Sequence, residues 1–267
     1  MQMTLRWYGS KYDTVTLKQI RQIPGVTGVI STLYGTTPGE AWEMEDILAL
    51  KKEIEDAGLT LAGIESVNIS DDIKTAGPKR DEHIANYITT LERLGQADIH
   101  MVCYNFMPVL DWARTDLDHP NPNGTTNLYF SYSEFAYFDI YIVGREGARE
   151  EWASFKVPGL DIDRDILAEV DELRANMTPE GEHKLVENII VKTQGFVSGN
   201  IREDDEHPIE LFRQLLSLYD GITKDQLREN MRYFLSAIMP VCEECGMNMC
   251  VHPDDPPFPV LGLPRIV

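Results

Sequence analysis

The stretch Asn248-Met-Cys-Val-His-Pro-Asp-Asp-Pro-Pro257 contains a short apolar segment that ends in an imidazole and then breaks at a run of prolines and carboxylates. We interpret Met249 to Val251 as a buried β-strand that carries His252 to the edge of a sheet, because prolines stop a strand and stiffen the loop after it. An imidazole beside carboxylates at a strand end can bind a divalent cation. His252 is therefore our candidate metal ligand, and the alternative is a histidine that is only packed or hydrogen-bonded.

Four more apolar segments precede this strand and alternate with amphipathic helical patterns. The predicted strands span residues 5–9, 26–33, 59–67 and 99–106. Apolar residues recur at helical spacing in residues 17–23, 47–57, 84–94 and 227–245. This strict strand-then-helix order predicts an α/β fold with a parallel sheet and right-handed crossovers.

Two folds have this order of elements, the open doubly wound sheet and the (β/α)8 barrel. A doubly wound dinucleotide fold would need a Gly-x-Gly-x-x-Gly turn after its first strand, and the sequence has none. We therefore predict a (β/α)8 TIM-barrel fold, in which the site gathers at the carboxyl ends of the strands. Five strands cannot close such a barrel, so we expect residues 1–267 to form a single incomplete barrel domain, truncated after about five strands, with an exposed edge.

The alternation of strand and helix patterns is interrupted between residues 109 and 222. This segment contains the turn Asn121-Pro-Asn-Gly124, an aromatic patch over residues 129–141, and helical patterns near residues 163–176, 180–191 and 206–219. A mainly helical insertion of this length after the fourth strand is typical of a lid or an interface element. We expect the aromatic side chains to pack inside the insertion rather than to stack on a ligand.

Composition limits the class of partner. The chain has 267 residues and a formal net charge of −20, which argues against nucleic acid or an anionic membrane as its partner. The first residues do not resemble a signal peptide, and no segment reaches the roughly 18 apolar residues of a membrane span. The four cysteines are unevenly spaced, which favours a reducing compartment. We expect a cytoplasmic enzyme.

The cysteines also raise a zinc alternative. Cys242, Cys245, Cys250 and His252 spell C-x2-C-x4-C-x-H, a spacing that suggests structural zinc. The two helical cysteines fall on an apolar stripe, however, where a free Cys behaves as a small hydrophobe. Cys250 and His252 would lie about 6.5 to 7 Å apart along one strand face. We favour the interpretation as core residues.

Candidate substrate-binding residues follow from the same strand-end geometry. Arg6 and Tyr8 lie on the first strand and Asn105 ends the fourth, so all three would approach the same barrel mouth as His252. Arg114 is a candidate clamp for a substrate carboxylate, because a guanidinium binds planar anions bidentately. A surface salt bridge is the alternative role for Arg114.

Several longer motifs are specific enough to compare with known families. They are Arg6-Trp-Tyr-Gly9, Ile64-Glu-Ser-Val67, Val102-Cys-Tyr-Asn-Phe-Met-Pro-Val-Leu-Asp-Trp112, Arg114-Thr-Asp-Leu117, His252-Pro-Asp-Asp-Pro-Pro257 and Leu261-Gly-Leu-Pro-Arg-Ile266. Together they resemble the D-mannonate dehydratase family of hexuronate catabolism, over essentially the whole chain. The resemblance implies a homo-oligomeric TIM-barrel lyase that uses Mn2+ or Fe2+ to convert D-mannonate to 2-dehydro-3-deoxy-D-gluconate. It also implies that His252 is one of the metal ligands.

The resemblance also implies that other parts of the site lie outside this sequence. In the family a Cys, a second His and an Asp complete the metal site, and a His and a Tyr are the candidate acid–base groups, all on strands six to eight. These positions would come after Val267, so the chain is expected to lack the C-terminal third of the family and no catalytic residue is assigned in it. A second departure is Ser70, in Ile69-Ser-Asp-Asp-Ile-Lys74, where the family usually has His.

Two alternatives therefore stay open. One is a metal-dependent sugar isomerase or epimerase on the same barrel. The other is a catalytically inactive fragment, or a half-enzyme that needs a complementary chain.

Overall fold

The computed structural model describes residues 2–156, 164–193, 201 and 205–267. The chain divides into two compact units. The first consists of Met1–Phe106, Lys224–Pro253 and Val267, and the second of Met107–Thr223 and Asp254–Ile266. None of the helices in the described part of the chain combines the length and apolar character of a membrane-spanning segment.

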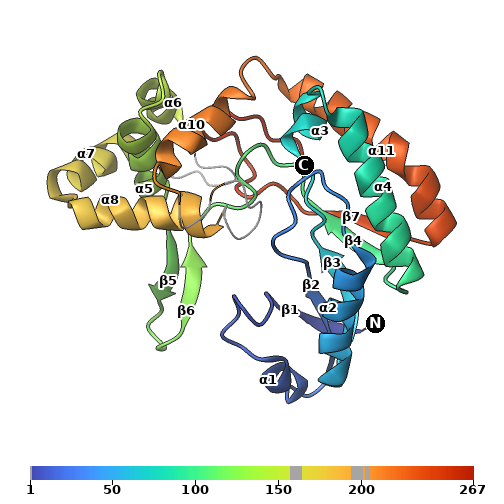
Figure 1. Cartoon of the computed structure of the whole chain (residues 1–267). Coiled ribbons are helices and arrows are strands. Elements are labelled where there is room, and N and C mark those ends of the chain that lie inside the picture. Colours follow the sequence, from blue (N-terminus) through green and yellow to red (C-terminus); the bar gives the residue numbers. More distant parts are fainter. Residues whose placement is uncertain (1, 157–163, 194–200, 202–204) are drawn as a thin grey trace. The chain divides into compact units, whose positions relative to one another are not determined.

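The first unit is built on a five-stranded parallel sheet (Figure 1). Its strands, in spatial order, are β1 (Met3–Arg6), β2 (Val26–Ser31), β3 (Thr60–Glu65), β4 (Met101–Tyr104) and β7 (Asn248–Val251). Each neighbouring pair is parallel. The prediction of an α/β fold with five parallel strands is confirmed, and this strand order is that of the first five strands of a (β/α)8 barrel.

Five helices accompany this sheet. They are α1 (Leu17–Arg21), α2 (Met44–Asp56), α3 (Asp71–Thr75), α4 (Arg80–Gln96) and α11 (Lys224–Cys245). The first of them begins at a capping box, in which Thr16 and Gln19 satisfy each other's backbone N–H groups. The apolar stripe of α11 faces the sheet, because Leu227, Phe234 and Ile238 are all fully buried.

Helices α4 and α11 run side by side and cover one face of the sheet (Figure 1). The ring of Phe234 on α11 lies 5.0 Å from the ring of Tyr87 on α4 and 6.4 Å from that of Tyr104 on β4. Because successive side chains of a strand point to opposite faces, Val102 and Tyr104 face these helices and Cys103 faces the other side.

The outer strands of this sheet carry exposed apolar side chains. Met3 and Leu5 on β1 are 57% and 38% exposed, and Val251 on β7 is 37% exposed. Among the described residues, β1 pairs only with β2 and β7 only with β4. Both outer edges therefore present unpaired backbone groups beside apolar side chains.

The second unit contains a β-hairpin and a set of helices (Figure 1). The hairpin is β5 (Asp116–Pro120) and β6 (Thr126–Tyr129). The helical segments are α5 (Tyr132–Tyr137), η1 (Phe138–Val143), α6 (Ala148–Ser154), α7 (Ile166–Asn176), α8 (Pro179–Val186), η2 (Glu187–Lys192) and α10 (Pro208–Ser217), of which η1 and η2 are π-helical. The helices expected near residues 163–176, 180–191 and 206–219 are present.

The hairpin differs from the sequence expectation, which gave a turn without flanking strands. The turn is formed as expected, because the Asn121 amide donates to Thr125 O at 2.8 Å and Gly124 adopts a φ of +82°. The flanking segments have few β-branched or apolar residues, so they carry no strand signal of their own. Stacking of the His119 and Tyr129 rings, 4.2 Å apart, joins the two strands instead.

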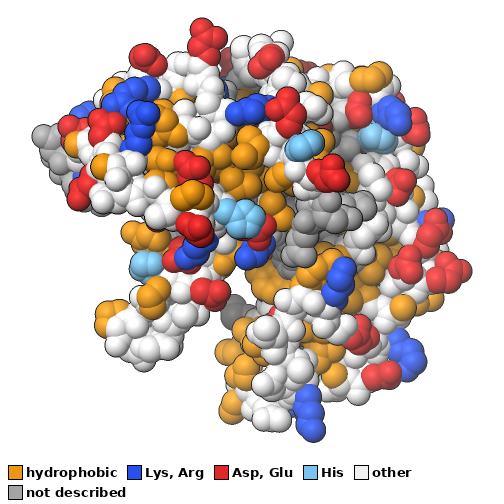
Figure 2. Space-filling view, turned by 60° about the vertical axis from the view of Figure 1, so that its left-hand side comes forward, with side chains coloured by type: hydrophobic (Ala, Val, Ile, Leu, Met, Phe, Trp, Pro, Cys, Tyr) orange, Lys and Arg blue, Asp and Glu red, His pale blue; other side chains and the backbone are white. Residues whose placement is uncertain are grey.

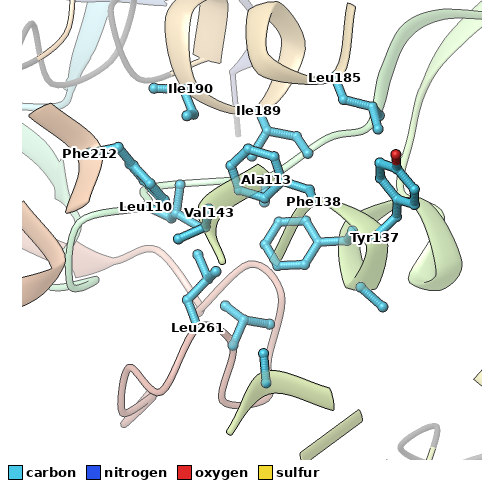
Figure 3. Close-up of a cluster of buried hydrophobic side chains, with 14 of the residues drawn as sticks. Leu110, Ala113, Tyr137, Phe138, Val143, Leu185, Ile189, Ile190, Phe212 and Leu261 are labelled. Atoms are coloured by element: carbon cyan, nitrogen blue, oxygen red, sulfur yellow. The ribbon is translucent and has the colours of Figure 1, made fainter. Parts of the chain in front are cut away.

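A hydrophobic cluster holds the second unit together (Figure 3). Its labelled members are Leu110, Ala113, Tyr137, Phe138, Val143, Leu185, Ile189, Ile190, Phe212 and Leu261. The aromatic patch contributes Phe135 and Phe138 to this core, both fully buried, as the sequence predicted. Val260, Leu261 and Leu263 also belong to the cluster, so the segment after β7 packs with the second unit.

Candidate functional site at the carboxyl ends of the strands

His252 directly follows β7 and continues its pairing with β4. Its backbone amide donates to Tyr104 O at 2.9 Å, which places the imidazole at the carboxyl end of the sheet. The ring is only partly buried, and its Nδ1 lies 2.7 Å from the carbonyl oxygen of Pro253. Since a carbonyl only accepts hydrogen bonds, this contact favours the proton on Nδ1, and in the neutral ring the lone pair is then on Nε2. Metal-bound histidines are commonly oriented in this way, by a carbonyl on the second nitrogen.

This imidazole fits one position of a cation site but does not complete one. Catalytic metal sites usually take three or more protein ligands. Within residues 2–156, 164–193, 201 and 205–267, no group of three or more His, Cys, Asp or Glu side chains is placed to hold a metal ion. Among the described residues, His252 therefore stays a single candidate ligand.

Arg6 holds the ends of three neighbouring strands. Its Nη2 donates to Glu65 O at 2.6 Å and its Nη1 to Trp7 O at 2.7 Å, with a longer contact of 3.3 Å to Ile30 O. Its Nε lies 3.6 Å from the carboxylate of Glu65. The guanidinium carbon lies 4.8 Å from the centre of the Tyr8 ring. The guanidinium thus joins β1, β2 and β3 and lies against Tyr8.

A tyrosine beside Arg6 has a perturbed pKa. The Tyr34 hydroxyl lies 3.3 Å from Arg6 Nη2. Burial raises the pKa of Tyr34 to about 12, and the nearby positive charge of Arg6 opposes this increase only in part. Tyr34 is therefore neutral at physiological pH, and its hydroxyl oxygen accepts from Arg6 Nη2.

Asn105 occupies the end of β4, beside the strand that carries His252. Its Nδ2 donates to Ser66 Oγ at 3.4 Å, and Ser66 Oγ donates to Asn68 Oδ1 at 3.2 Å. The structure therefore brings Arg6, Tyr8, Asn105 and His252 to the carboxyl ends of one parallel sheet.

Arg114 belongs to the second unit and already holds a carboxylate. Its Nη1 and Nη2 donate to the two carboxylate oxygens of Asp255 at 3.0 and 2.7 Å. Its guanidinium carbon also lies 5.3 Å from the ring of Trp112, whose backbone forms a bridge to that of Asp255. Arg6, Tyr8, Asn105 and His252 lie in the first unit, and Arg114 lies in the second. The contact observed for Arg114 is an ion pair whose side chains are 21% and 30% exposed.

A family model described as D-mannonate dehydratase (UxuA) matches residues 1–267. The chain belongs to the D-mannonate dehydratase family.

Curated and solved members of the family agree with this assignment. The chain is 45% identical to a mannonate dehydratase of Brachyspira hyodysenteriae, with 100% of this chain and 62% of that protein aligned. It is 39% identical to the mannonate dehydratase of Thermotoga maritima, at the same coverages. The crystal structure of mannonate dehydratase from Streptococcus suis serotype 2 superposes with a TM-score of 0.65 and 34% identity, over 99% of this chain and 57% of that one. The chain thus spans about 62% of the length of these curated relatives.

The four cysteines of the chain are all free thiols. Cys242 lies on the buried stripe of α11, as predicted from its spacing, and burial raises the pKa of its thiol. Cys245 is partly buried against Gly95 of α4, and Cys250 is exposed on β7. Cys242 therefore behaves as a core residue.

Sequence reasoning missed a buried charged pair next to the His-Pro-Asp-Asp-Pro-Pro motif. Asp254 and Arg265 are each 3% exposed, and their closest charged atoms are 4.0 Å apart. Arg265 Nη1 donates to Leu110 O at 3.1 Å, and Asp254 Oδ2 accepts from the Ile266 amide at 2.5 Å. Burial lowers the pKa of Arg265, and the Asp254 carboxylate opposes this decrease. The signal in the sequence was an arginine inside the apolar run Leu261-Gly-Leu-Pro-Arg-Ile266.

A second missed contact joins the loop after β3 to α4. His83 Nδ1 lies 2.7 Å from Ser70 Oγ and 3.9 Å from an Asp72 carboxylate oxygen. Ser70 and Asp72 both approach Nδ1 of His83. A catalytic triad uses both ring nitrogens of its histidine, so this arrangement is not a triad. Ser70 was noted in the sequence, but His83 lies on a separate helix and had no signal of its own.

Proposed function

We propose that this chain takes part in the reaction of its family, the removal of water from D-mannonate to give 2-dehydro-3-deoxy-D-gluconate. The observation that carries the proposal is the orientation of His252, whose Nδ1 is held by Pro253 O and whose Nε2 lone pair is left at the carboxyl end of the sheet. The family assignment over the whole chain supports it.

The proposed reaction is a β-elimination, in which the proton on C2 is removed and the hydroxyl on C3 leaves. A proton beside a carboxylate is only weakly acidic, so negative charge develops on the carboxylate oxygens as it is removed. A divalent cation, Mn2+ or Fe2+ in our proposal, supplies Lewis-acid stabilisation of that charge when it is bound. His252 would hold the cation through Nε2. We assign no acid or base among the described residues.

Arg6, Tyr8 and Asn105 are proposed to orient the substrate. Asn105 brings an amide to the strand ends, and Tyr8 brings a phenol that lies against the Arg6 guanidinium. Arg6 donates mainly to backbone carbonyls. Its proposed contribution is therefore positive charge at the carboxyl ends of the strands, rather than a bidentate hydrogen bond to the substrate. Arg114 is proposed to bind the substrate carboxylate by exchanging it for that of Asp255.

A second candidate is a chain that is inactive alone and needs a complementary polypeptide. Two observations favour it. The chain spans about 62% of its curated relatives, and its described residues supply one candidate ligand where several are needed. In this case the metal site would assemble only when further segments associate with the chain.

One experiment tests the proposal and separates the two cases. The purified chain is mixed with Mn2+ and D-mannonate, and 2-keto acid is measured with and without the part of the Brachyspira hyodysenteriae relative that lies outside the aligned region. We expect product only with that part, and identification of the product separates dehydration from isomerisation or epimerisation. Turnover by the chain alone would refute the half-enzyme candidate.

The complemented protein then tests the role of His252. We expect His252→Ala to lower Mn2+ affinity by more than about 100-fold, because loss of even a partner of a ligand costs about 10- to 100-fold. Asn248→Ala, on the exposed start of the same strand, is the matched control. Unchanged Mn2+ affinity and dehydration rate in His252→Ala would overturn the proposal.

A further inference from the structure

Two cysteines lie directly opposite each other on neighbouring strands of the first unit. Cys103 on β4 and Cys250 on β7 are register partners in a parallel pair. Neighbouring strands are about 4.8 Å apart, so their Cα atoms are separated by roughly that distance. Disulfides form across Cα separations of about 4.4 to 6.8 Å. The two backbones are thus close enough for a bond between the side chains.

The two thiols also share a face of the sheet. Cys103 lies between Val102 and Tyr104, which face the helices, and therefore points to the opposite side. Cys250 points the same way, because register partners on adjacent strands share a face. Its Sγ lies 3.7 Å from Val102 O, the carbonyl immediately before Cys103. The Cys250 thiol therefore leans over β4 rather than away from it.

Cys250 is the most accessible of the four cysteines. Cys103 and Cys245 are partly exposed, and Cys242 is buried on α11. Among the described strands, β7 is an outer strand that pairs on one side only. A small movement of β7 toward β4 therefore disturbs fewer hydrogen bonds than the same movement of an inner strand.

We propose that Cys103 and Cys250 form a vicinal dithiol that closes to an intrachain disulfide by exchange with a low-molecular-weight disulfide. The exposed Cys250 thiolate attacks one sulfur of the reagent, forms a mixed disulfide and releases one thiol. Cys103 then attacks the Cys250 sulfur and releases the second thiol. Two protein S–H bonds and one reagent S–S bond are broken, and one protein S–S bond and two reagent S–H bonds form. Two electrons pass from the protein to the reagent.

The position of the pair gives the link a structural consequence. Asn105 and His252 each follow a cysteine of the pair by two residues on the same strands. A covalent bond would therefore tie the two strands together just below the ends that carry these side chains. The dithiol does not depend on the proposed enzymatic function, because its chemistry is measured without metal or substrate.

The test uses a Cys242→Ala, Cys245→Ala variant of the full chain. Residues 233–265 contain no Lys or Arg before Arg265, so trypsin leaves Cys242, Cys245 and Cys250 on one peptide. After incubation with oxidised glutathione, remaining thiols are alkylated and the chain is analysed by intact mass and peptide mapping. We expect both thiols to be lost together, no glutathione to be retained, and residues 94–114 to be linked to residues 233–265.

Single variants decide the order of attack and provide the controls. In the same background, Cys103→Ser is expected to retain one glutathione on Cys250, since the resolving thiol is gone. Cys250→Ser is expected to react much more slowly at Cys103. A stable glutathione adduct on Cys250 with Cys103 still open to alkylation would overturn the proposal, and so would a disulfide that joins two chains on a non-reducing gel.

Discussion

The hydrogen bond from His252 to its neighbouring carbonyl decides how this residue can act. Proline has no amide to donate, so Pro253 contributes only its oxygen, and the imidazole turns Nδ1 toward it at 2.7 Å. The same proline ends β7 and so fixes the position of the ring at the strand end. Pro253 therefore determines both where the His252 ring lies and which of its nitrogens donates a hydrogen bond.

The Arg114–Asp255 pair is a second residue-scale feature that can be measured. Both side chains are largely buried, so we expect Arg114→Ala and Asp255→Asn each to lower the free energy of unfolding by about 1 to 2 kcal/mol, between the values for exposed and buried pairs. The double variant should lose less than the sum, by about 1 kcal/mol, because the second change removes a partner that is already unpaired. Denaturant unfolding of the four proteins checks this, and strictly additive losses would show that the pair does not form in solution.

The raised pKa of Tyr34 predicts a pH dependence of stability. The folded-state pKa of about 12 lies above the unfolded value of 10.0, so the contribution is fully present below pH 10 and is lost between pH 10 and 12. We expect the stability of the chain relative to Tyr34→Phe to fall by at most about 2 to 3 kcal/mol over this range. Parallel urea titrations of the two proteins at pH 9 and pH 11 measure this difference. A constant difference would contradict the assigned burial.

At the scale of elements, a buried aspartate joins the π-helix η1 to helix α6. Asp139 is completely buried, and its carboxylate accepts from Arg145 Nε at 2.9 Å, from Arg145 Nη2 at 2.7 Å and from Trp152 Nε1 at 2.9 Å. Its backbone oxygen accepts from the Gly144 amide at 3.0 Å, which closes the end of η1. Every one of these bonds converges on a single residue.

Asp139→Asn should therefore be strongly destabilising. The change removes the fully buried carboxylate from the Arg145 guanidinium, which is 19% exposed, and leaves only Glu151, whose carboxylate lies 2.7 Å away and is 43% exposed. Breaking a buried pair costs about 3 to 5 kcal/mol, and the remaining Glu151 contact places the expected loss at the lower end of this range. We expect faster hydrogen exchange of the amides in η1 and α6. Arg164→Ala, which removes a partly exposed pair with Glu169, is the matched control and should cost no more than about 1 kcal/mol. Equal effects of the two variants would argue against the buried network.

At the scale of the whole molecule, the charge of the chain is strongly negative. Figure 2 shows acidic side chains spread over the visible face, with lysines and arginines among them rather than in a separate patch. The formal net charge of −20 means that repulsion between carboxylates outweighs attraction overall. The compact state therefore carries an electrostatic penalty that salt can reduce.

Raising NaCl from about 0.02 M to about 0.3 M should increase the urea midpoint of unfolding, because the screening length falls from about 20 Å to about 6 Å. KCl at equal concentration should have the same effect, which separates screening from binding of a particular cation. A midpoint that falls with either salt would mean that favourable ion pairs outweigh the net repulsion.

The order of elements was determined by the sequence itself. Apolar periodicity and the glycine and proline stops act over a few residues, so the five parallel strands, four of the five helices beside them and the position of His252 before Pro253 could be predicted locally. The short helix α3 was not predicted, because Asp71–Thr75 is mostly polar. The sequence motifs were also sufficient to identify the family. None of this required knowing which distant segments meet.

Only the tertiary structure decided the partners. Arg114 and Asp255 are 141 positions apart in the chain, and the sequence gives no local signal that their side chains meet. The opposition of Cys103 and Cys250 depends on strand register, and a shift of one residue would have moved either thiol to the other face of the sheet. Periodicity specifies which face of an element is buried. Which charges and thiols then face each other is set by the packing of elements that lie far apart in sequence.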